Sequence, residues 1–146
     1  MAQEPDWKTN LRNLEKHKLA LLLQHDGQIL FRSDKPGMEP LVELLESNMD
    51  NLVGTTVVAR TLGITAAKLL LWQHVMRIDA LVASRLAEDL LRPSGIAVNV
   101  QKSVDRIADP KTHQPCRYEA LGVKYDHPEE LHHALRSELL IFAAKK

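Results

Sequence analysis

The sequence has one cysteine, no long apolar run and no recognisable targeting segment. One cysteine among 146 residues excludes an internal disulfide. A cysteine-poor chain that begins "MAQEPDWKTNLRNLEK", without the pattern of a signal peptide, is typical of the cytoplasm. The longest apolar runs, "LALLL" and "LLLW", are far shorter than the roughly 20 residues of a membrane span. We therefore expect a cytoplasmic protein that does not enter a membrane.

Net charge and aromatic side chains are also scarce. The 19 Lys and Arg residues balance the 19 Asp and Glu residues, and the basic residues are scattered along the chain. Attraction to a phosphate backbone needs a basic excess or stripe, and stacking on single-stranded bases needs aromatic side chains, which make up only 4% of the sequence. Nucleic acid is therefore not expected as a partner. A hydrophobic content of 45% instead indicates a folded globular chain of one domain, residues 1–146.

The apolar residues alternate between strand-like and helix-like spacing. Helical spacing covers 5–16, 39–47, a segment after Thr61 as N-cap, a segment from Ser84 to Arg92, and a last segment that begins at Pro128 behind Asp126. Strand-like runs cover 19–24 and 28–33 around an Asp-Gly turn, then 55–59, 78–83 and 96–101, and a polar loop spans 102–116. This order predicts an α/β fold with a mixed sheet in a three-layer α/β/α arrangement. Residues 1–17 form a helical extension in this interpretation, and 18–146 form the core.

Three stretches of the chain carry a resemblance to a known family. They are "LLLQHDGQILFRSDKPGMEPLVELLE", "GTTVVARTLGITAAKLLLW", and "QPCRYEALG" ahead of "PEELHHALRSEL". Over roughly residues 18–140 the chain resembles a small uncharacterised family of prokaryotic domains of unknown function that share the cytidine-deaminase-like fold and lack its zinc. The resemblance implies that fold and no metal or other cofactor.

The residues themselves argue against deaminase chemistry. Deaminases of this fold hold zinc with an H-x-E motif at one helix start and P-C-x-x-C at the next. This chain has "TLGITAAK" and "VASRLAEDLL" at those places, without His or Cys and without a Glu to shuttle protons. In "QPCRYE", Glu119 stands where a second cysteine would be. His113 with Cys116 and one of the adjacent His132 and His133 falls short of the usual ligand set for zinc.

Two strand ends are candidates for binding an anion. Arg60, Thr61 and Gly63 lie between a strand and a helix, and Ser84 and Arg85 repeat the arrangement one unit later. Free N–H groups at a helix start, with a hydroxyl and an arginine beside them, can hold a phosphate. The same residues are also explained if Thr61 and Ser84 are ordinary N-caps and the two arginines are solvated. For each strand end, this simpler interpretation is preferred over an anion site.

Cys116 is a candidate nucleophile. Arg117 beside it and His113 three residues earlier would favour the thiolate, which is the reactive form, and Asp109 could orient His113. A small apolar side chain that fills a gap under a loop is the simpler interpretation of a free cysteine.

Three functions remain open from the sequence. The preferred one is a zinc-less deaminase-fold domain that binds a small polar or phosphate-bearing metabolite near Arg60, Thr61, Ser84 and Arg85, under the loop that carries Cys116. The second is an interaction or scaffold module without chemistry, and the third is a thiol-dependent enzyme. A homodimer is compatible with this fold class.

Overall fold

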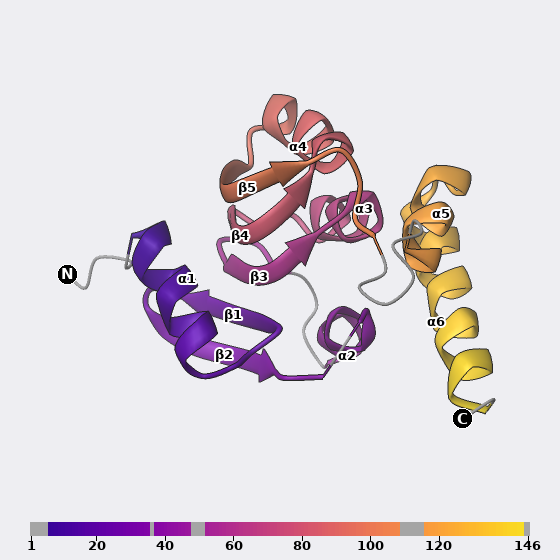
Figure 1. The fold of residues 1–146 in the computed structure, drawn as a ribbon, viewed down its shortest axis with the longest axis horizontal. Coiled ribbons are helices and arrows are strands. Elements are labelled where there is room, and N and C mark those ends of the chain that lie inside the picture. The colour runs from indigo at the N-terminus through magenta and orange to yellow at the C-terminus, as the bar shows by residue number, and fades with distance from the viewer. Residues whose placement is uncertain (1–5, 36, 48–51, 109–115, 145–146) are drawn as a thin grey trace.

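The computed structural model describes residues 6–35, 37–47, 52–108 and 116–144, with the side chains of 141–144 excepted. Within these ranges five strands form one mixed sheet with six α-helices around it (Figure 1). In chain order the elements are α1 (Trp7–Lys16), β1 (Leu21–His25), β2 (Gln28–Ser33), α2 (Glu39–Glu46), β3 (Thr56–Leu62), α3 (Ile64–Trp72), β4 (Arg77–Ser84), α4 (Arg85–Leu91), a short 3-10 turn (Arg92–Ser94), β5 (Ala97–Val104), α5 (Arg117–Lys124) and α6 (Pro128–Ala144).

The sheet has the strand order β2-β1-β3-β4-β5. β1 runs antiparallel to both β2 and β3, whereas β3, β4 and β5 are parallel. Asp26 and Gly27 join β1 to β2 with φ values of 50° and 80°, the left-handed pair that a tight hairpin turn requires. The α/β class and the mixed sheet predicted from the sequence are thus confirmed.

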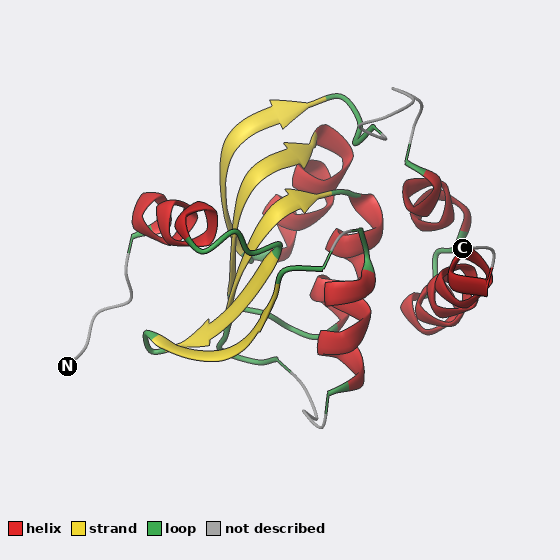
Figure 2. Ribbon diagram, turned by 60° about the horizontal axis from the view of Figure 1, so that its bottom comes forward, coloured by secondary structure: helices red, strands yellow, loops and turns green. Residues whose placement is uncertain are grey.

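One face of the sheet carries α2, α3 and α4, and the last two helices pack outside them (Figure 2). α3 explains this extra layer, because Ile64, Ala67, Leu69 and Leu70 are all buried and point to different sides of a nine-residue helix. A helix that is apolar all round must be covered all round. α5 and α6 therefore contact α3, and α6 also contacts α2, so these two helices do not lie on the sheet as three simple layers would require.

The opposite face of the sheet is covered by α1. Leu11 and Leu14 pack against Leu22, Val58 and Leu81 from three neighbouring strands. Asp6 caps this helix by accepting a hydrogen bond from the Thr9 N–H at 2.8 Å.

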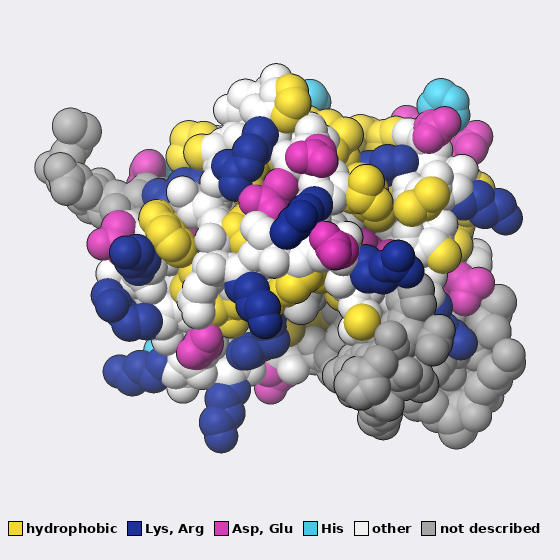
Figure 3. Space-filling view, turned by 45° about the horizontal axis from the view of Figure 1, so that its top comes forward, with side chains coloured by type: hydrophobic (Ala, Val, Ile, Leu, Met, Phe, Trp, Pro, Cys, Tyr) yellow, Lys and Arg dark blue, Asp and Glu magenta, His cyan; other side chains and the backbone are white. Residues whose placement is uncertain are grey.

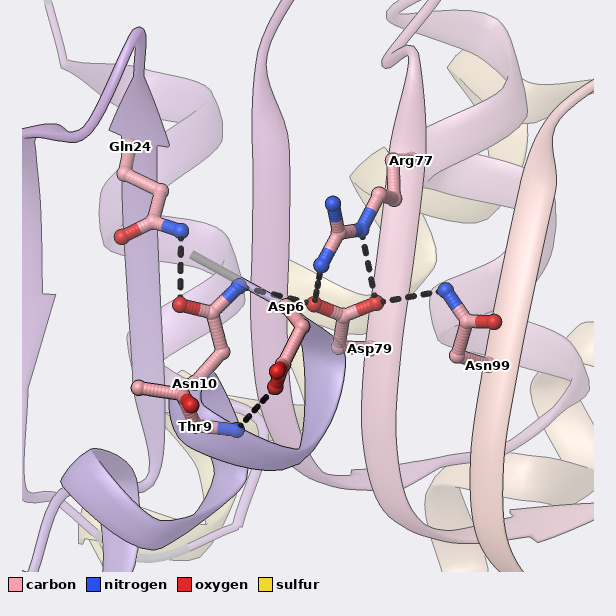
Figure 4. A network of polar contacts seen from close by, with 7 residues as sticks. All are labelled: Asp6, Thr9, Asn10, Gln24, Arg77, Asp79 and Asn99. Atoms are coloured by element: carbon pink, nitrogen blue, oxygen red, sulfur yellow. Dashed lines mark hydrogen bonds and ion pairs between the residues drawn. The ribbon is translucent and has the colours of Figure 1, made fainter. Parts of the chain in front are cut away.

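A buried polar network lies beside this apolar contact (Figure 4). Asp79 on β4 has no exposed surface and accepts hydrogen bonds from Asn10 at 2.9 Å, from Arg77 at 2.8 and 3.0 Å, and from Asn99 at 3.0 Å. Gln24 on β1 donates to Asn10 at 3.0 Å. A buried charge is tolerated when it is paired and hydrogen-bonded, so α1 supplies part of what this carboxylate needs.

Local sequence signals predicted the start of one helix correctly and the start of another wrongly. Ser84 caps α4 by accepting from the Ala87 N–H, as predicted, and Gly95 ends the following turn with φ of 94°. Thr61 is not an N-cap, because β3 continues through Leu62 and the N-cap of α3 is Gly63, which has no capping side chain. The polar loop predicted over 102–116 is shorter at its start, since β5 extends to Val104, and α5 directly after it was not predicted.

None of the helices among the described residues is both long enough and apolar enough to cross a bilayer.

Candidate ligand-binding site

A cavity of about 460 Å³ lies at the carboxyl end of β3. Five segments line it: the entry to β1, the entry to α2, the turn from β3 into α3, residues 107–108 after β5, and the first turn of α5. In sheets with parallel strands, ligands bind in the crevice outside the carboxyl ends of the strands. The described lining consists of Lys18, Ala20, Leu21, Asp34, Lys35, Gly37, Met38, Pro40, Leu41, residues 59–63, Ala66, Leu70, Ile107, Ala108, Cys116, Tyr118 and Glu119.

The carboxylate of Glu119 occupies the start of α3. It accepts hydrogen bonds from the Ile64 N–H at 2.7 Å and from the Thr65 N–H at 3.4 Å. Gly63 carries no side chain that could do this, and a Cβ at position 63 would overlap the carboxylate. Glu119 therefore acts as the N-cap side chain of a helix that begins 55 residues earlier in the chain.

Further contacts fix α5 against α3. The Thr65 hydroxyl donates to the Tyr118 carbonyl, and Gly122 lies so close that a Cβ there would come within 2.8 Å of the Thr65 Cα. At the other end of α5, Lys68 donates to the carbonyls of Gly122 at 2.6 Å and Tyr125 at 3.1 Å. Side chains therefore fix both ends of α5 against α3. Thr65 and Lys68 of α3 bond to backbone carbonyls of α5 and its C-cap, and Glu119 of α5 bonds to the start of α3.

Burial changes the acidity of two cavity residues. It raises the pKa of Glu119 above its usual range, and the hydrogen bonds from Ile64 and Thr65 offset only part of this effect. Burial also raises the pKa of the Tyr118 phenol. The wall of the cavity formed by α5 thus carries a phenol and a carboxyl group that both resist ionisation.

The mouth of the cavity carries the remaining charges. Lys35 pairs with Glu43 at 2.6 Å, and this contact raises the pKa of Lys35. Arg60 is exposed and donates from Nη2 to the Leu19 carbonyl at 2.8 Å. Lys18 is exposed and has a left-handed φ of 55°, and Asp34 is exposed beside Lys35.

Cys116 is partly buried in the cavity wall, where it precedes the first residue of α5. Its N–H donates to the Ile107 carbonyl at 3.0 Å, and its carbonyl accepts from the Glu119 N–H at 3.0 Å. These backbone bonds start α5 and bring Glu119 to α3. Arg117 is exposed, and His113 and Asp109, the residues expected to activate the thiol, lie outside the described residues.

Comparison with known proteins identifies the family. Residues 10–139 match the sequence profile of the family described as "TM1506: Domain of unknown function (DUF1893)". The chain belongs to the DUF1893 family. It is similar to the crystal structure of a DUF1893 family protein, TM1506, from Thermotoga maritima, with 28% sequence identity and a TM-score of 0.80 over 94% of this chain and 95% of that one. No curated protein matches the chain.

The residues predicted for the site of this DUF1893 protein fall in two places. Arg60, Thr61, Gly63 and Cys116 line the cavity. Ser84 is buried as the cap of α4, and Arg85 is exposed with Nη1 3.5 Å from an Asp105 carboxylate oxygen. Arg117, the remaining residue predicted to bind the ligand, is exposed at the start of α5, and none of these three belongs to the described lining.

Other lining residues escaped the sequence analysis. Glu119 was seen only as a missing cysteine, and Lys18 and Tyr118 were not considered. Their only local signal is position, because Tyr118 and Glu119 follow Cys116 directly and Lys18 precedes β1. The contact between Glu119 and α3 spans 55 residues, and no local pattern encodes it.

Metal-binding side chains do not gather in the DUF1893 chain as described: no three His, Cys, Asp or Glu residues among the described ones lie close enough to share an ion. His132 instead has its Nε2 buried without a hydrogen bond, 3.6 Å from a Glu46 oxygen. On the face drawn in Figure 3, Lys and Arg side chains are interspersed with Asp and Glu. That face therefore presents no continuous surface of one charge.

Proposed function

We propose that this DUF1893 protein binds a small metabolite in the cavity at the end of β3 and carries out no deamination. The observation that carries the proposal is the cavity itself. Its volume of about 460 Å³ falls within the roughly 300–1,000 Å³ typical of ligand sites, and its walls come from five separate segments of the chain.

The proposal includes a deaminase-like fold without the metal. A hairpin followed by two strand–helix units supports that fold. The residues at the two helix starts do not fit zinc, since Gly63, Ile64 and Thr65 open α3 and Ser84 precedes α4. Glu119 also takes up the N–H groups at the start of α3, so a phosphate is not expected to bind there.

A ligand screen tests the binding function. Metabolites with and without phosphate are compared by their effect on thermal unfolding, because a ligand at 100 times its dissociation constant adds about 2.7 kcal/mol to the free energy of unfolding. Ala66→Leu should abolish the effect, since Ala66 is buried and lines the cavity. Ala120→Leu, on the exposed side of α5, is the matched control. A complete screen without any stabilisation would contradict the proposal.

A thiol-dependent reaction is the second candidate, and the place of Cys116 in the cavity wall favours it. A ligand that fills the cavity should then shield the thiol and slow its alkylation by iodoacetamide at least tenfold. Cys116→Ser distinguishes the two functions, because it should preserve binding and abolish any turnover.

The scaffold function has less support. The large apolar side chains that are exposed among the described residues are spread along the chain, and only Ile29 and Leu30 share an element, β2. Exposed apolar side chains of this kind are normal for a monomer surface: Ile29, Leu30, Val53, Met76, Leu86, Val123 and Leu140.

A further inference from the structure

The inner part of the cavity is lined by apolar side chains. Leu21, Leu41, Leu62 and Leu70 line it, and each has at most 5% of its surface exposed. Ala59 and Ala66 add two small buried side chains. A polar group placed among them would lose its hydrogen bonds to water without replacement, which costs free energy. The part of a ligand that reaches this depth must therefore be apolar.

Among the described residues, the mouth of the cavity has an excess of positive charge. Lys35 is neutralised by Glu43, which leaves Lys18, Arg60 and Asp34. Within the described residues, neither Lys18 nor Arg60 forms an ion pair with a carboxylate. At the described part of the mouth, Lys18 and Arg60 therefore face the single carboxylate of Asp34, since the Glu119 carboxylate lies at the start of α3. The Arg60 guanidinium has donors beyond the one directed at Leu19.

Glu119 decides where an anionic group can bind. The N–H groups of Ile64 and Thr65 are the usual anion site at a helix start, and the Glu119 carboxylate already accepts from both. A ligand anion at that point would also meet the Glu119 carboxylate at close range. The mouth, between Lys18 and Arg60, is the favourable place.

We infer that the ligand is an amphipathic anion, with an apolar body among the leucines and one negatively charged head group between Lys18 and Arg60. This inference rests on the proposed function and specifies the chemical class of the ligand. It differs from the sequence expectation of a small polar metabolite, because most of the described wall is apolar.

The test uses three compounds with one body and different head groups: 3-phenylpropanoate, 3-phenylpropan-1-ol and 3-phenylpropylamine. Calorimetric titration at pH 7.5 should show the carboxylate binding at least about tenfold more tightly than the alcohol, as expected for hydrogen bonds to charged groups, and the amine binding most weakly. Lys18→Gln with Arg60→Gln should remove the preference for the carboxylate and leave the affinity for the alcohol unchanged. Lys16→Gln with Arg32→Gln removes two exposed charges outside the described lining and is the control.

The outcomes separate this inference from the proposed function. Equal binding of carboxylate and alcohol, or tighter binding of the amine, with both abolished by Ala66→Leu, would overturn the ligand class and leave the binding function standing. If a polar compound from the wider screen binds and none of the three probes does, the ligand class would likewise be overturned and the binding function would stand. If no compound binds in either experiment, both proposals fail.

Discussion

Gly63 and Glu119 illustrate how one residue's identity depends on a partner far away in the chain. The φ of Gly63 is −101°, which any residue adopts, so its backbone does not require glycine. A Cβ at position 63 would fall where the Glu119 carboxylate lies, so this side chain would have to move away from the N–H groups of Ile64 and Thr65. Glycine at this N-cap offers no side chain to accept from the helix N–H groups. The carboxylate of Glu119, on another helix, accepts from them instead.

A double-mutant cycle tests this dependence. Gly63→Ala should destabilise the protein by about 1–3 kcal/mol, the usual cost of overpacking. In a Glu119→Ala background the same change should cost at least about 1 kcal/mol less, because the obstacle is gone. Urea unfolding of the four proteins gives both values. Equal costs in the two backgrounds would show that the carboxylate does not set the residue at 63.

The raised pKa of Glu119 predicts a pH dependence. Because the folded state holds this proton more tightly than the unfolded state, the stability that protonation contributes is fully present below the ordinary value of 4.5 and is lost as the pH rises through the raised folded value. Unfolding free energies from pH 4 to 8 should therefore fall for the wild type relative to Glu119→Gln, which cannot titrate. A difference that rises with pH would contradict this assignment.

Single residues were the least predictable level from the sequence. Ser84 was predicted correctly because an N-cap acts on its own helix, three residues away. Thr61 was assigned a cap wrongly, since a hydroxyl before a helix gave the same signal although β3 had not yet ended. Glu119 could not be recognised, because its function depends on α3 and not on its neighbours in the chain.

At the scale of elements, α1 depends on a polar contact as well as an apolar one. Asp79 is fully buried, and Asn10 is the only residue of α1 that donates to it among the described hydrogen bonds. Gln24 then links Asn10 to β1. The network therefore sets the position of the helix on the sheet, while the leucines of α1 supply the buried area.

Substitutions in the network should separate these contributions. Asp79→Ala leaves the partly buried Arg77 without its closest carboxylate and should cost about 3–5 kcal/mol. Asn10→Ala should cost about 1–3 kcal/mol, because it removes one hydrogen bond to a buried charge. Asn13→Ala, exposed on the same helix, should change stability by less than about 0.5 kcal/mol. Chemical denaturation measures all three, and a neutral Asn10→Ala would show that apolar packing alone positions α1.

Elements with a strong period were predictable, and elements defined by contacts were not. The hairpin turn, the helix 5–16 and the strands 78–83 and 96–101 follow from alternation and turn residues, and each is present with shifted ends. α5 has a mixed sequence, with only Gly122 buried among its eight residues. Its stability comes from Lys68, Thr65 and the start of α3, so periodicity gave no signal for it.

At the scale of the whole molecule, the balance of charge predicts a solubility minimum near neutral pH. The chain has 19 basic and 19 acidic residues and seven histidines, with a sequence pI of about 7.1. Proteins without net charge associate most readily, and the chain gains net charge as the pH moves away from its pI in either direction. Precipitation by polyethylene glycol should therefore need less precipitant at pH 7 than at pH 5.5 or 8.5. A flat profile would show that the cavity and exposed apolar side chains dominate association.

The contact between Glu119 and α3 also affects how the chain folds during its synthesis. The ribosome releases the start of α3 55 residues before the side chain that completes it, a delay of roughly 3–11 s at typical translation speeds. During that interval the N–H groups at the start of the central helix lack the side chain that caps them, and the leucines of that helix are not yet covered by α6. Stalled chains that end before Glu119 should consequently be open to proteases and chaperones, and release of the last quarter of the chain should be the event that closes the fold.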